Sequence, residues 1–389
     1  MSTRRHVVYV TGTRADYGLM RKVLFAIHRH PHLRLSLLVT GMHLLREFGY
    51  TVQEVERDGF EVSSRVSMAL GEDTPAAMAR SLGLGILGMA QAFEQSRPDI
   101  VLLEGDRGES LAAAISAGHM GIAVAHVSGG DVTAGVIDES IRHAITKFAH
   151  VHFPGTDLSA RRLLAMGEDP AHVHMVGTPG SDLLAELSLR PEQVAERLGL
   201  DLSRPVVVVL QHPETAGAEE AAADQMRETM EAVSQLGHQT VLIYPNSDTG
   251  GREMIRVIQE YMGRSFLKTH QNLPREVFVG LLSVASVMVG NSSSALTDAP
   301  NFGLPAVNVG IRQASRERGG NIIDVPHDRE RIRAAIEGAL SRLDDPEFRA
   351  CCRQSPYQDL NTAEQVAEVL ADTELGPRLL QKVFHDTAL

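Results

Sequence analysis

The chain has 389 residues, of which 43% are apolar, and its 37 basic and 49 acidic residues give a net charge of -12 at pH 7. This length predicts two domains or three, and the apolar content is enough for sizeable cores. The acidic balance argues against broad nucleic-acid binding, which needs a basic surface. No apolar run approaches the ~20 residues of a membrane span, and no secretory signal is visible at the N-terminus. We therefore expect a cytoplasmic protein with neither nucleic acid nor a membrane as its partner.

Short apolar runs alternate with longer amphipathic stretches along the whole chain. The first series of expected strands lies at 6–11, 35–40, 99–104, 122–127, 151–153 and 173–176. The second series lies at 205–210, 240–244, 287–289, 306–309 and 321–325. Several of these runs are rich in Val and Ile without alternation, as in parallel strands buried on both faces, and crossover helices fit between them. The sequence therefore predicts an α/β protein with two doubly wound, Rossmann-like domains.

A domain boundary is expected within residues 181–205, where a short helix at 191–197 precedes the second series of strands. We place the N-terminal Rossmann-like domain at 1–185 and the C-terminal one at 186–360, with C-terminal helices over 361–389.

The C-terminal segment contains its own helix signals. Asn361 is expected to cap a helix over 362–373, and Gly376-Pro377 would then break it. A last short helix would run from there to about residue 386.

Two patterns that imitate cofactor sites are better explained by packing. Gly83, Gly85 and Gly88 have the spacing of a dinucleotide-binding loop, but a helical segment at 75–82 precedes them where a strand is required. The histidines show no zincin spacing, and the two cysteines are adjacent, which excludes a Cys-rich zinc module. We expect no metal, no NAD and no other cofactor.

Polar clusters follow several strands, and ligands of open α/β sheets bind outside the carboxyl ends of their strands. The first cluster is the turn at 11–18, where Arg14 adds positive charge to the N–H groups at the start of a helix. Asp16 in this turn either binds a ligand or only caps the helix.

The second cluster is the turn at 104–109, where three carboxylates and Arg107 follow an apolar strand. Capping and ion pairing explain two of these charges, so we expect this turn to bind a ligand.

The third cluster joins a loop to a helix. The loop Ser128-Gly-Gly-Asp131 is followed by apolar residues whose spacing predicts a helix at 137–148. Asp138 and Arg142 share one face of this helix, four residues apart. A surface salt bridge would explain that pair, but the density of titratable groups in one loop and helix favours chemistry.

The fourth cluster lies in the second half of the chain. A serine-rich turn at 290–294 follows one expected strand and precedes a short helix, so its hydroxyls and N–H groups could converge on a phosphate. Further polar residues follow neighbouring strands: His212, Asn246, Asp248 and Arg312. The alternative is a turn whose serines only cap the helix. No Walker lysine or Gly-x-Ser-x-Gly elbow is present, so P-loop and hydrolase-triad sites are excluded.

Together these motifs resemble those of the hydrolysing UDP-N-acetylglucosamine 2-epimerases, which open sialic-acid-type pathways. The resemblance is carried by residues 13–18, 105–107, 137–147, 245–248, 290–294 and 310–313. It implies the two-domain glycosyltransferase-B-type fold, with the active site in the cleft between the domains and a C-terminal helix that crosses back onto the first domain. The first domain would act on the sugar and the second would hold UDP. We expect a UDP-sugar substrate and a homodimer or homotetramer.

The resemblance also implies a reaction. UDP leaves by anti elimination to give a 2-acetamidoglucal, and syn hydration then gives free N-acetylmannosamine. Removal of the C2 proton needs positioned carboxylates, and expulsion of UDP needs cations on the diphosphate. Asp106 and Asp138 are the leading acid and base candidates, and Arg142 would orient or neutralise them. The residues that would hold the substrate are Arg14, Asp16, His43, Arg107, Ser128, His212, Asn246, Asp248, Ser292, Ser293, Asp298 and Arg312.

Two positions depart from the family pattern. Many members have a catalytic Glu where this chain has Ser128, and Asp131 is a candidate replacement. Many also have Glu where this chain has Asp298, the position expected to grip the ribose hydroxyls. A sister group that acts on UDP-2,4-diacetamido-2,4,6-trideoxyglucose, on the way to legionaminic acid, carries loops like Ser-Gly-Gly-Asp, so this sugar is an alternative substrate. A non-catalytic UDP-sugar-binding protein and a glycosyltransferase are the remaining alternatives, although the dense carboxylates disfavour the first and no acceptor feature supports the second.

Overall fold

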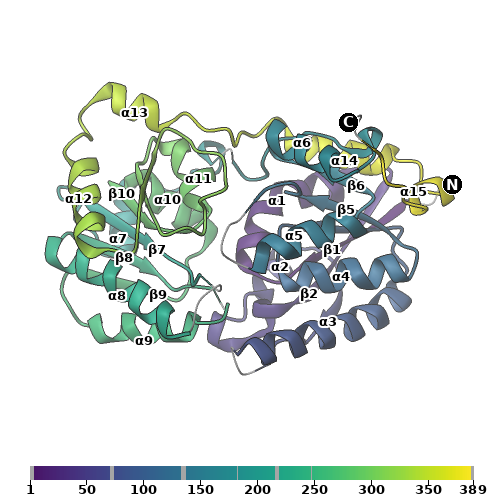
Figure 1. The fold of residues 1–389 in the computed structure, drawn as a ribbon, viewed down its shortest axis with the longest axis horizontal. Coiled ribbons are helices and arrows are strands. Elements are labelled where there is room, and N and C mark those ends of the chain that lie inside the picture. Colours follow the sequence, from purple (N-terminus) through teal and green to yellow (C-terminus); the bar gives the residue numbers. More distant parts are fainter. Residues whose placement is uncertain are drawn as a thin grey trace. The chain divides into compact units, whose positions relative to one another are not determined.

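The computed structural model describes residues 4–70, 74–132, 137–181, 183–214, 219–246 and 248–386. The chain divides into two compact units (Figure 1). The first unit comprises Met1–Asp131, Ile137–Gly180 and Tyr357–Leu389, and the second comprises Val132–Val136 and Ser181–Pro356. The chain therefore returns to the first unit after completing the second.

The first unit is built on a six-stranded parallel sheet with the order β3-β2-β1-β4-β5-β6. Its strands are β1 (Arg5–Thr11), β2 (Leu33–Thr40), β3 (Val62–Val66), β4 (Ile100–Glu104), β5 (Ala123–Val127) and β6 (Val151–Phe153). This is the strand order of a doubly wound Rossmann-like sheet, in which the order reverses between β1 and β4.

Helices cover both faces of this sheet, because successive strand residues point to opposite sides. Val7 and Tyr9 of β1 pack in one core with α1 (Arg14–Arg29), α2 (Val52–Arg57) and α14 (Thr362–Asp372). Val8 and Val10 pack in the other core with α3 (Pro75–Ser96), α4 (Gly108–His119) and α5 (Ile137–Phe148). Two shorter helices, α6 (Asp157–Ala165) and α15 (Pro377–Leu380), complete this unit.

The second unit repeats the architecture with the sheet order β12-β11-β10-β7-β8-β9. Its strands are β7 (Val206–Leu210), β8 (Gln239–Ile243), β9 (Leu267–His270), β10 (Val287–Gly290), β11 (Ala306–Val309) and β12 (Ile322–Val325). Its helices are α7 (Pro191–Leu198), α8 (Glu219–Leu236), α9 (Gly251–Tyr261), α10 (Arg275–Val284), α11 (Ser294–Thr297), α12 (Arg329–Leu340) and α13 (Pro346–Cys352). Read from β9, the order is again that of a doubly wound sheet, and it reverses between β7 and β10.

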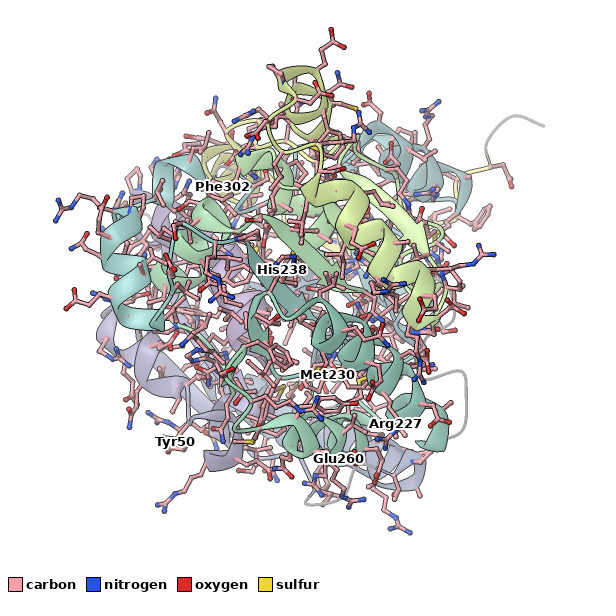
Figure 2. The ribbon with its side chains drawn as sticks, turned by 90° about the vertical axis from the view of Figure 1, so that its left-hand side faces the viewer. Tyr50, Arg227, Met230, His238, Glu260 and Phe302 are labelled. Carbon is pink, nitrogen blue, oxygen red and sulfur yellow. The ribbon has the colours of Figure 1, made fainter. Side chains whose placement is uncertain are left out.

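One core of the second unit lies between its sheet and three helices, α8, α9 and α12. Met230 of α8 is fully buried in this core, and Arg227 on the same helix reaches Glu260 of α9 at 2.6 Å (Figure 2). Within the described residues, no helix is both long enough and apolar enough to cross a membrane. The two sheets confirm the predicted α/β class with two Rossmann-like domains.

Three strand assignments differ from the sequence prediction. The edge strands β3 and β9 were not predicted, because both are short and polar, as edge strands with one free side often are. Residues 173–176 were expected to form a strand, which is wrong: Val173 makes only an isolated bridge to His152. The alternation of His and Val in that segment imitates a strand, but the sheet already ends at β6.

The helix predictions also need corrections at their ends. The glycines at 83, 85 and 88 lie inside α3, which confirms that they are not a dinucleotide-binding loop. Asn361 precedes α14 but has a left-handed backbone and makes no side-chain cap; Asp359 accepts the N–H of Thr362 at 2.9 Å instead. The last helix, α15, ends at Leu380, short of the expected residue 386.

Candidate active site

The turn after β1 is held together by Asp16, in the first turn of α1. Its carboxylate accepts hydrogen bonds from the N–H groups of Gly12 (3.1 Å) and Thr13 (2.7 Å) and from the hydroxyls of Thr11 and Thr13. The Thr13 hydroxyl accepts the N–H of Asp16 in return, which completes a capping box. Burial raises the pKa of Asp16 above its usual value. Asp16 therefore caps α1, and its contact with a ligand stays a prediction.

His43 packs against the same turn and is fully buried. Its Nε2 pairs with the Thr11 hydroxyl at 2.9 Å, and its Nδ1 pairs with the Thr51 hydroxyl at 2.7 Å. Burial lowers the pKa of His43 to about 4, so the imidazole is neutral at pH 7. Both ring nitrogens bond inside the protein, so His43 supports the turn, and its expected contact with the substrate stays a prediction.

The two arginines of these turns lie beside carboxylates. Arg14 donates from Nε to Glu54 of α2 at 2.9 Å, and its side chain is 14% exposed. Arg107 lies 3.9 Å from Glu109, at the start of α4, and is 17% exposed. Both cations thus lie at the carboxyl edge of the sheet with a local counter-charge, and an anionic ligand would compete with that carboxylate for each of them.

An ion pair joins the turn after β4 to α5. The Asp106 carboxylate contacts the guanidinium of Arg142, whose side chain is only 1% exposed. Arg142 also donates from Nη1 to the carbonyl oxygen of Ser128 at 2.9 Å. One buried cation therefore ties the turn after β4 to the loop after β5, and the structure brings together three residues that the sequence singled out separately.

The first turns of α5 present two pairs of charged side chains to different surroundings. Asp138 is 4% exposed and Arg142 is buried on the same side of the helix. Glu139 and His143 form the second pair, 3.1 Å apart, and both side chains remain partly exposed. The buried pair, and not the exposed one, lies on the side of α5 that meets Asp106.

The loop after β5 packs closely against α6. Ser128 has a left-handed backbone with φ of 62°, which a residue with a side chain seldom adopts. Gly130 has φ of 80°, and a Cβ there would lie 2.2 Å from the carbonyl oxygen of Ser159. The Ser159 hydroxyl donates to the Asp131 carboxylate at 2.6 Å, and Asp131 is 8% exposed. Asp131 is thereby anchored to α6.

Two further residues of this edge were not selected from the sequence. Glu104 ends β4, and burial raises its pKa to about 8, with the Asp16 and Asp106 carboxylates adding to the rise. His126 of β5 is fully buried, and its Nε2 lies 2.7 Å from the carbonyl oxygen of Gly105, so this nitrogen carries the hydrogen. Burial lowers the pKa of His126 to about 3. Both belong to predicted motifs; His126 is distinguished by its full burial, and Glu104 by the carboxylates around it.

A second set of polar residues lies at the carboxyl edge of the other sheet, where β7 and β10 end. The Asn291 side chain accepts the N–H of His212 at 2.7 Å and donates to its carbonyl oxygen at 2.9 Å. His212 Nδ1 accepts the N–H of Asn246 at 3.1 Å, so the ring hydrogen lies on Nε2. Asn246 in turn donates to Asp248 at 2.6 Å. The structure brings the three predicted residues together and adds Asn291 as their link to β10.

The serine turn follows directly after β10. Gly290 has φ of 128°, and a Cβ there would lie 2.2 Å from the carbonyl oxygen of Leu210, so only glycine fits. Ser292 is 5% exposed and accepts the N–H of Ser294 at 3.3 Å. Ser293 stands at the N-cap of α11, but its side chain makes no capping hydrogen bond. Because α11 has only four residues, its dipole is weak, and an anion here would depend on hydroxyls and nearby cations.

Arg312 follows β11 on a loop that a carboxylate holds in place. Glu214 accepts the backbone N–H groups of Ile311 (2.8 Å) and Arg312 (3.2 Å). Burial alone would raise the pKa of Glu214, but these bonds and a bond from His327 hold it below its usual value. The Arg312 guanidinium lies 3.4 Å from the carbonyl oxygen of Asn291, which places it beside the serine turn.

Asp298 lies just after α11 and is 2% exposed. Burial raises the pKa of Asp298, while the nearby Arg275 and hydrogen bonds from Thr297 and Ser294 oppose the rise. Within the part of the chain that the structure describes, no group of three or more His, Cys, Asp and Glu residues is placed to hold a metal ion. Each unit thus presents its own polar site at the strand ends where ligands of doubly wound sheets bind.

The comparisons with known proteins decide the family. The family model described as UDP-N-acetylglucosamine 2-epimerase matches residues 25–371 of this chain. The chain belongs to the UDP-N-acetylglucosamine 2-epimerase family. A Legionella pneumophila relative named UDP-N,N'-diacetylbacillosamine 2-epimerase (hydrolyzing) is 38% identical over 379 residues, which cover 97% of this chain and 98% of the relative. The UDP-N-acetylglucosamine 2-epimerase of Neisseria meningitidis serogroup B is 32% identical over 386 residues, which cover 99% and 100%.

Solved structures of epimerases share the fold at low sequence identity. The Neisseria meningitidis UDP-GlcNAc 2-epimerase, crystallised with UDP-GlcNAc, has a TM-score of 0.79 at 18% identity and covers 95% of this chain and 100% of its own. The Methanocaldococcus jannaschii enzyme, in complex with UDP-GlcNAc and UDP, has a TM-score of 0.76 at 15% identity and covers 94% and 99%. These likenesses confirm the glycosyltransferase-B-type fold that the sequence motifs implied.

Proposed function

We propose that this epimerase-family protein is a hydrolysing 2-epimerase, which releases UDP from a UDP-linked 2-acetamido sugar and frees the sugar with inverted configuration at C2. The observation that carries the proposal is the ion pair between Asp106 and the buried Arg142, at the strand ends of the first sheet and on the helix that also presents Asp138. A pure binding protein for a dianionic nucleotide sugar would gain nothing from carboxylates at this edge.

The first chemical step needs a base for the proton on C2. Asp106 and Asp138 are the two proposed candidates, since each is a short carboxyl side chain at the strand-end site. Arg142 fixes the orientation of Asp106 through the ion pair and joins it to the loop at Ser128. The C1–O bond breaks as the C2 proton leaves, its electron pair goes to the departing phosphate, and a 2-acetamidoglucal results.

The leaving group is proposed to bind the second unit. Two serine hydroxyls, at 292 and 293, and the guanidinium of Arg312 supply donors and positive charge for the diphosphate. The Nε2 hydrogen of His212 is a further donor, because Nδ1 is held by Asn246. Arg14 and Arg107 are proposed to supply positive charge at the strand-end site of the first unit. Asp298 is proposed to accept hydrogen bonds from the ribose hydroxyls.

Between the two substrates that the sequence left open, we propose that UDP-2,4-diacetamido-2,4,6-trideoxyglucose is preferred over UDP-GlcNAc. Two findings support this order: the Ser128-Gly-Gly-Asp131 loop, and the 38% identity to the relative named for UDP-N,N'-diacetylbacillosamine, which is the same sugar nucleotide. The relative named for UDP-N-acetylglucosamine is 32% identical. This order reverses the initial expectation, in which UDP-GlcNAc came first.

The proposal is tested by incubating the purified chain separately with each of the two UDP-sugars, followed by proton NMR. We expect free sugar of mannosamine configuration together with UDP, formed fastest from the UDP-linked diacetamido sugar. A UDP-linked epimer as the end product would contradict the hydrolytic reaction. Tight binding of both sugars without turnover would instead favour a sensor.

A further inference from the structure

Glu104 is a carboxyl group at the strand-end site that the proposed mechanism has not used. It is the last residue of β4, where the strand order of the first sheet reverses, and it pairs across the sheet with Val127, directly before Ser128. Its backbone carbonyl accepts the Ser110 hydroxyl at 2.9 Å, which fixes the end of the strand to α4. The side chain is partly buried and adjoins the Asp106 turn.

The groups that face Glu104 come from every neighbouring element. The Asp16 carboxylate approaches from α1, Asp106 from the adjoining turn and the Arg142 guanidinium from α5. The Ser128 side chain makes a hydrogen bond to the Glu104 carboxyl. The charge of Glu104 also helps to raise the pKa of Tyr9, a fully buried residue of β1. Burial is the largest influence, the two carboxylates add to it, and together they raise the pKa of Glu104 to about 8 despite Arg142 and Ser128.

Asp106 and Glu104 therefore have different surroundings, although they are two residues apart. Asp106 contacts the cation directly and is held as its ion-pair partner. Glu104 lies in a partly buried position next to other carboxylates, which favours the neutral acid. Paired carboxyls whose environments differ in this way are suited to divide the roles of base and acid between them.

Inversion at C2 requires two such groups. The proton leaves C2 from one face and must return to the other face to give the inverted product, so one fixed carboxyl cannot serve both steps. The group that returns the proton must hold it at the start of hydration, and therefore must be an acid at neutral pH. Glu104 meets this requirement at the same strand ends as the candidate bases.

We propose that Glu104 is a further catalytic residue, the carboxylic acid that donates a proton to C2 of the 2-acetamidoglucal during hydration. This inference rests on the proposed function. The O–H bond of Glu104 breaks as the new C2–H bond forms, water oxygen bonds to C1, and the Glu104 carboxylate takes up the proton that this water loses. The base of the first step gives the original C2 proton to solvent. Over the whole cycle one water is consumed, and one proton is released together with UDP.

The test is Glu104→Gln in the full-length chain, with the UDP-sugar that the wild type turns over best. Glutamine keeps the size of the side chain and an acceptor for Ser128, but it has no acidic proton. We expect UDP release to persist within about tenfold while formation of the free sugar falls ~10²-fold, so that the 2-acetamidoglucal accumulates and is visible by NMR. Glu104→Asp, which keeps a carboxyl, is expected to restore part of the hydration.

A matched control is Glu61→Gln, which makes the same chemical change elsewhere in the sheet. Glu61 lies directly before β3, at the amino edge of the sheet, and forms an exposed ion pair with Arg34. It should leave UDP release and hydration unchanged.

The second readout is the pH dependence of glucal hydration by the enzyme in the presence of UDP. The wild-type rate should fall as pH rises past about 8, the pKa of Glu104, and Glu104→Gln should lack this fall.

Two results would overturn the inference while leaving the proposed function intact. One is normal sugar release by Glu104→Gln with the wild-type pH profile. The other is equal loss of UDP release and hydration in a variant that melts at the wild-type temperature. If the wild type itself releases no free sugar from either nucleotide sugar, the proposed function is wrong. That result differs from both results above, in which the wild type is active and only the role of Glu104 is wrong.

Discussion

The guanidinium of Arg142 is almost fully buried, so its charge needs the Asp106 carboxylate nearby. Asp106→Asn removes that charge with little change in shape. If Asp106 transfers a proton, turnover should fall ~10²–10⁴-fold with a modest change in KM. Steady-state kinetics with the preferred UDP-sugar measure this, and Asp157→Asn, at the exposed start of α6, is the control. A rise in KM with unchanged turnover would mean that Asp106 only binds substrate.

Asp131 presents a separate question at the residue scale, because its carboxylate is bonded to Ser159 in α6. Asparagine at this position can still accept that hydrogen bond, so Asp131→Asn tests the charge and not the anchor. If Asp131 replaces the glutamate of other family members, we expect a severe loss of turnover for Asp131→Asn and a mild one for Ser128→Ala. A fully active Asp131→Asn variant would restrict Asp131 to holding the loop.

The sequence predicted the charged groups of the first unit better than their roles. Asp106 and Arg142 were selected from motifs at strand ends and in a helix, and the structure pairs them. Asp16 and His43 were selected as well, but their polar atoms bond to threonines and backbone groups of the turn. A sequence does not show which lone pairs are already used. Nor does it show which carboxylates lie around Glu104 in the fold.

At the scale of elements, the close approach of β10 to β7 depends on Gly290. A Cβ at this position would overlap the Leu210 carbonyl oxygen at 2.2 Å, and φ of 128° is unfavourable for any other residue. Gly290→Ala should therefore lower the free energy of unfolding by about 2–4 kcal/mol. Gly338, exposed within α12 with open space around it, is the control: Gly338→Ala should raise stability by about 0.5–1 kcal/mol. Equal melting temperatures for the two variants would contradict the packing argument.

The C-terminal segment is held to the first unit by Glu168, which is 1% exposed and contacts Lys147, His152 and Lys382. Burial alone would raise the pKa of Glu168, but hydrogen bonds from these three residues lower it to about 2. Because the folded pKa lies below the ordinary 4.5, this carboxylate stabilises the fold fully above pH 4.5 and loses that effect as pH falls toward 2.

Glu168→Gln should therefore lower the melting temperature at pH 7 and speed hydrogen exchange in 377–386. The difference from the wild type should shrink as the pH falls below 4.5. Glu61→Gln, in an exposed ion pair, should change little at any pH. A difference that stays constant down to about pH 2 would contradict this assignment.

Among the elements, the buried strands could be predicted and the edges could not. Runs such as Val206–Leu210 are apolar throughout because helices cover both faces of the sheet. The edge strands β3 and β9 carry Ser, Arg, Lys, Thr and His, which give no such signal. At 173–176 a strand was predicted that the structure does not contain. The alternating residues there lie beyond the last strand of the sheet, and Val173 makes only an isolated bridge.

At the scale of the whole molecule, two sheets with the same strand order each place a polar site where that order reverses. The chain order of strands and helices was enough to predict this class of fold. The apolar pattern alone did not show to which unit the last residues belong, because residues 357–389 return to the first unit after the second is complete. The apolar face of α14 packs in the same core as α1, and periodicity alone does not identify such a partner.

We propose that the sugar is epimerised by elimination and hydration, with proton transfer by carboxyl groups of the first unit. The most direct measurement is NMR and mass analysis of the sugar released in D₂O and in H₂¹⁸O, after extensive desalting and with EDTA present. We expect deuterium at C2, because the returning proton comes from an enzyme group that exchanges with solvent, and ¹⁸O at C1, because water completes the reaction. Retention of the original hydrogen at C2, or a released sugar without ¹⁸O at C1, would contradict it.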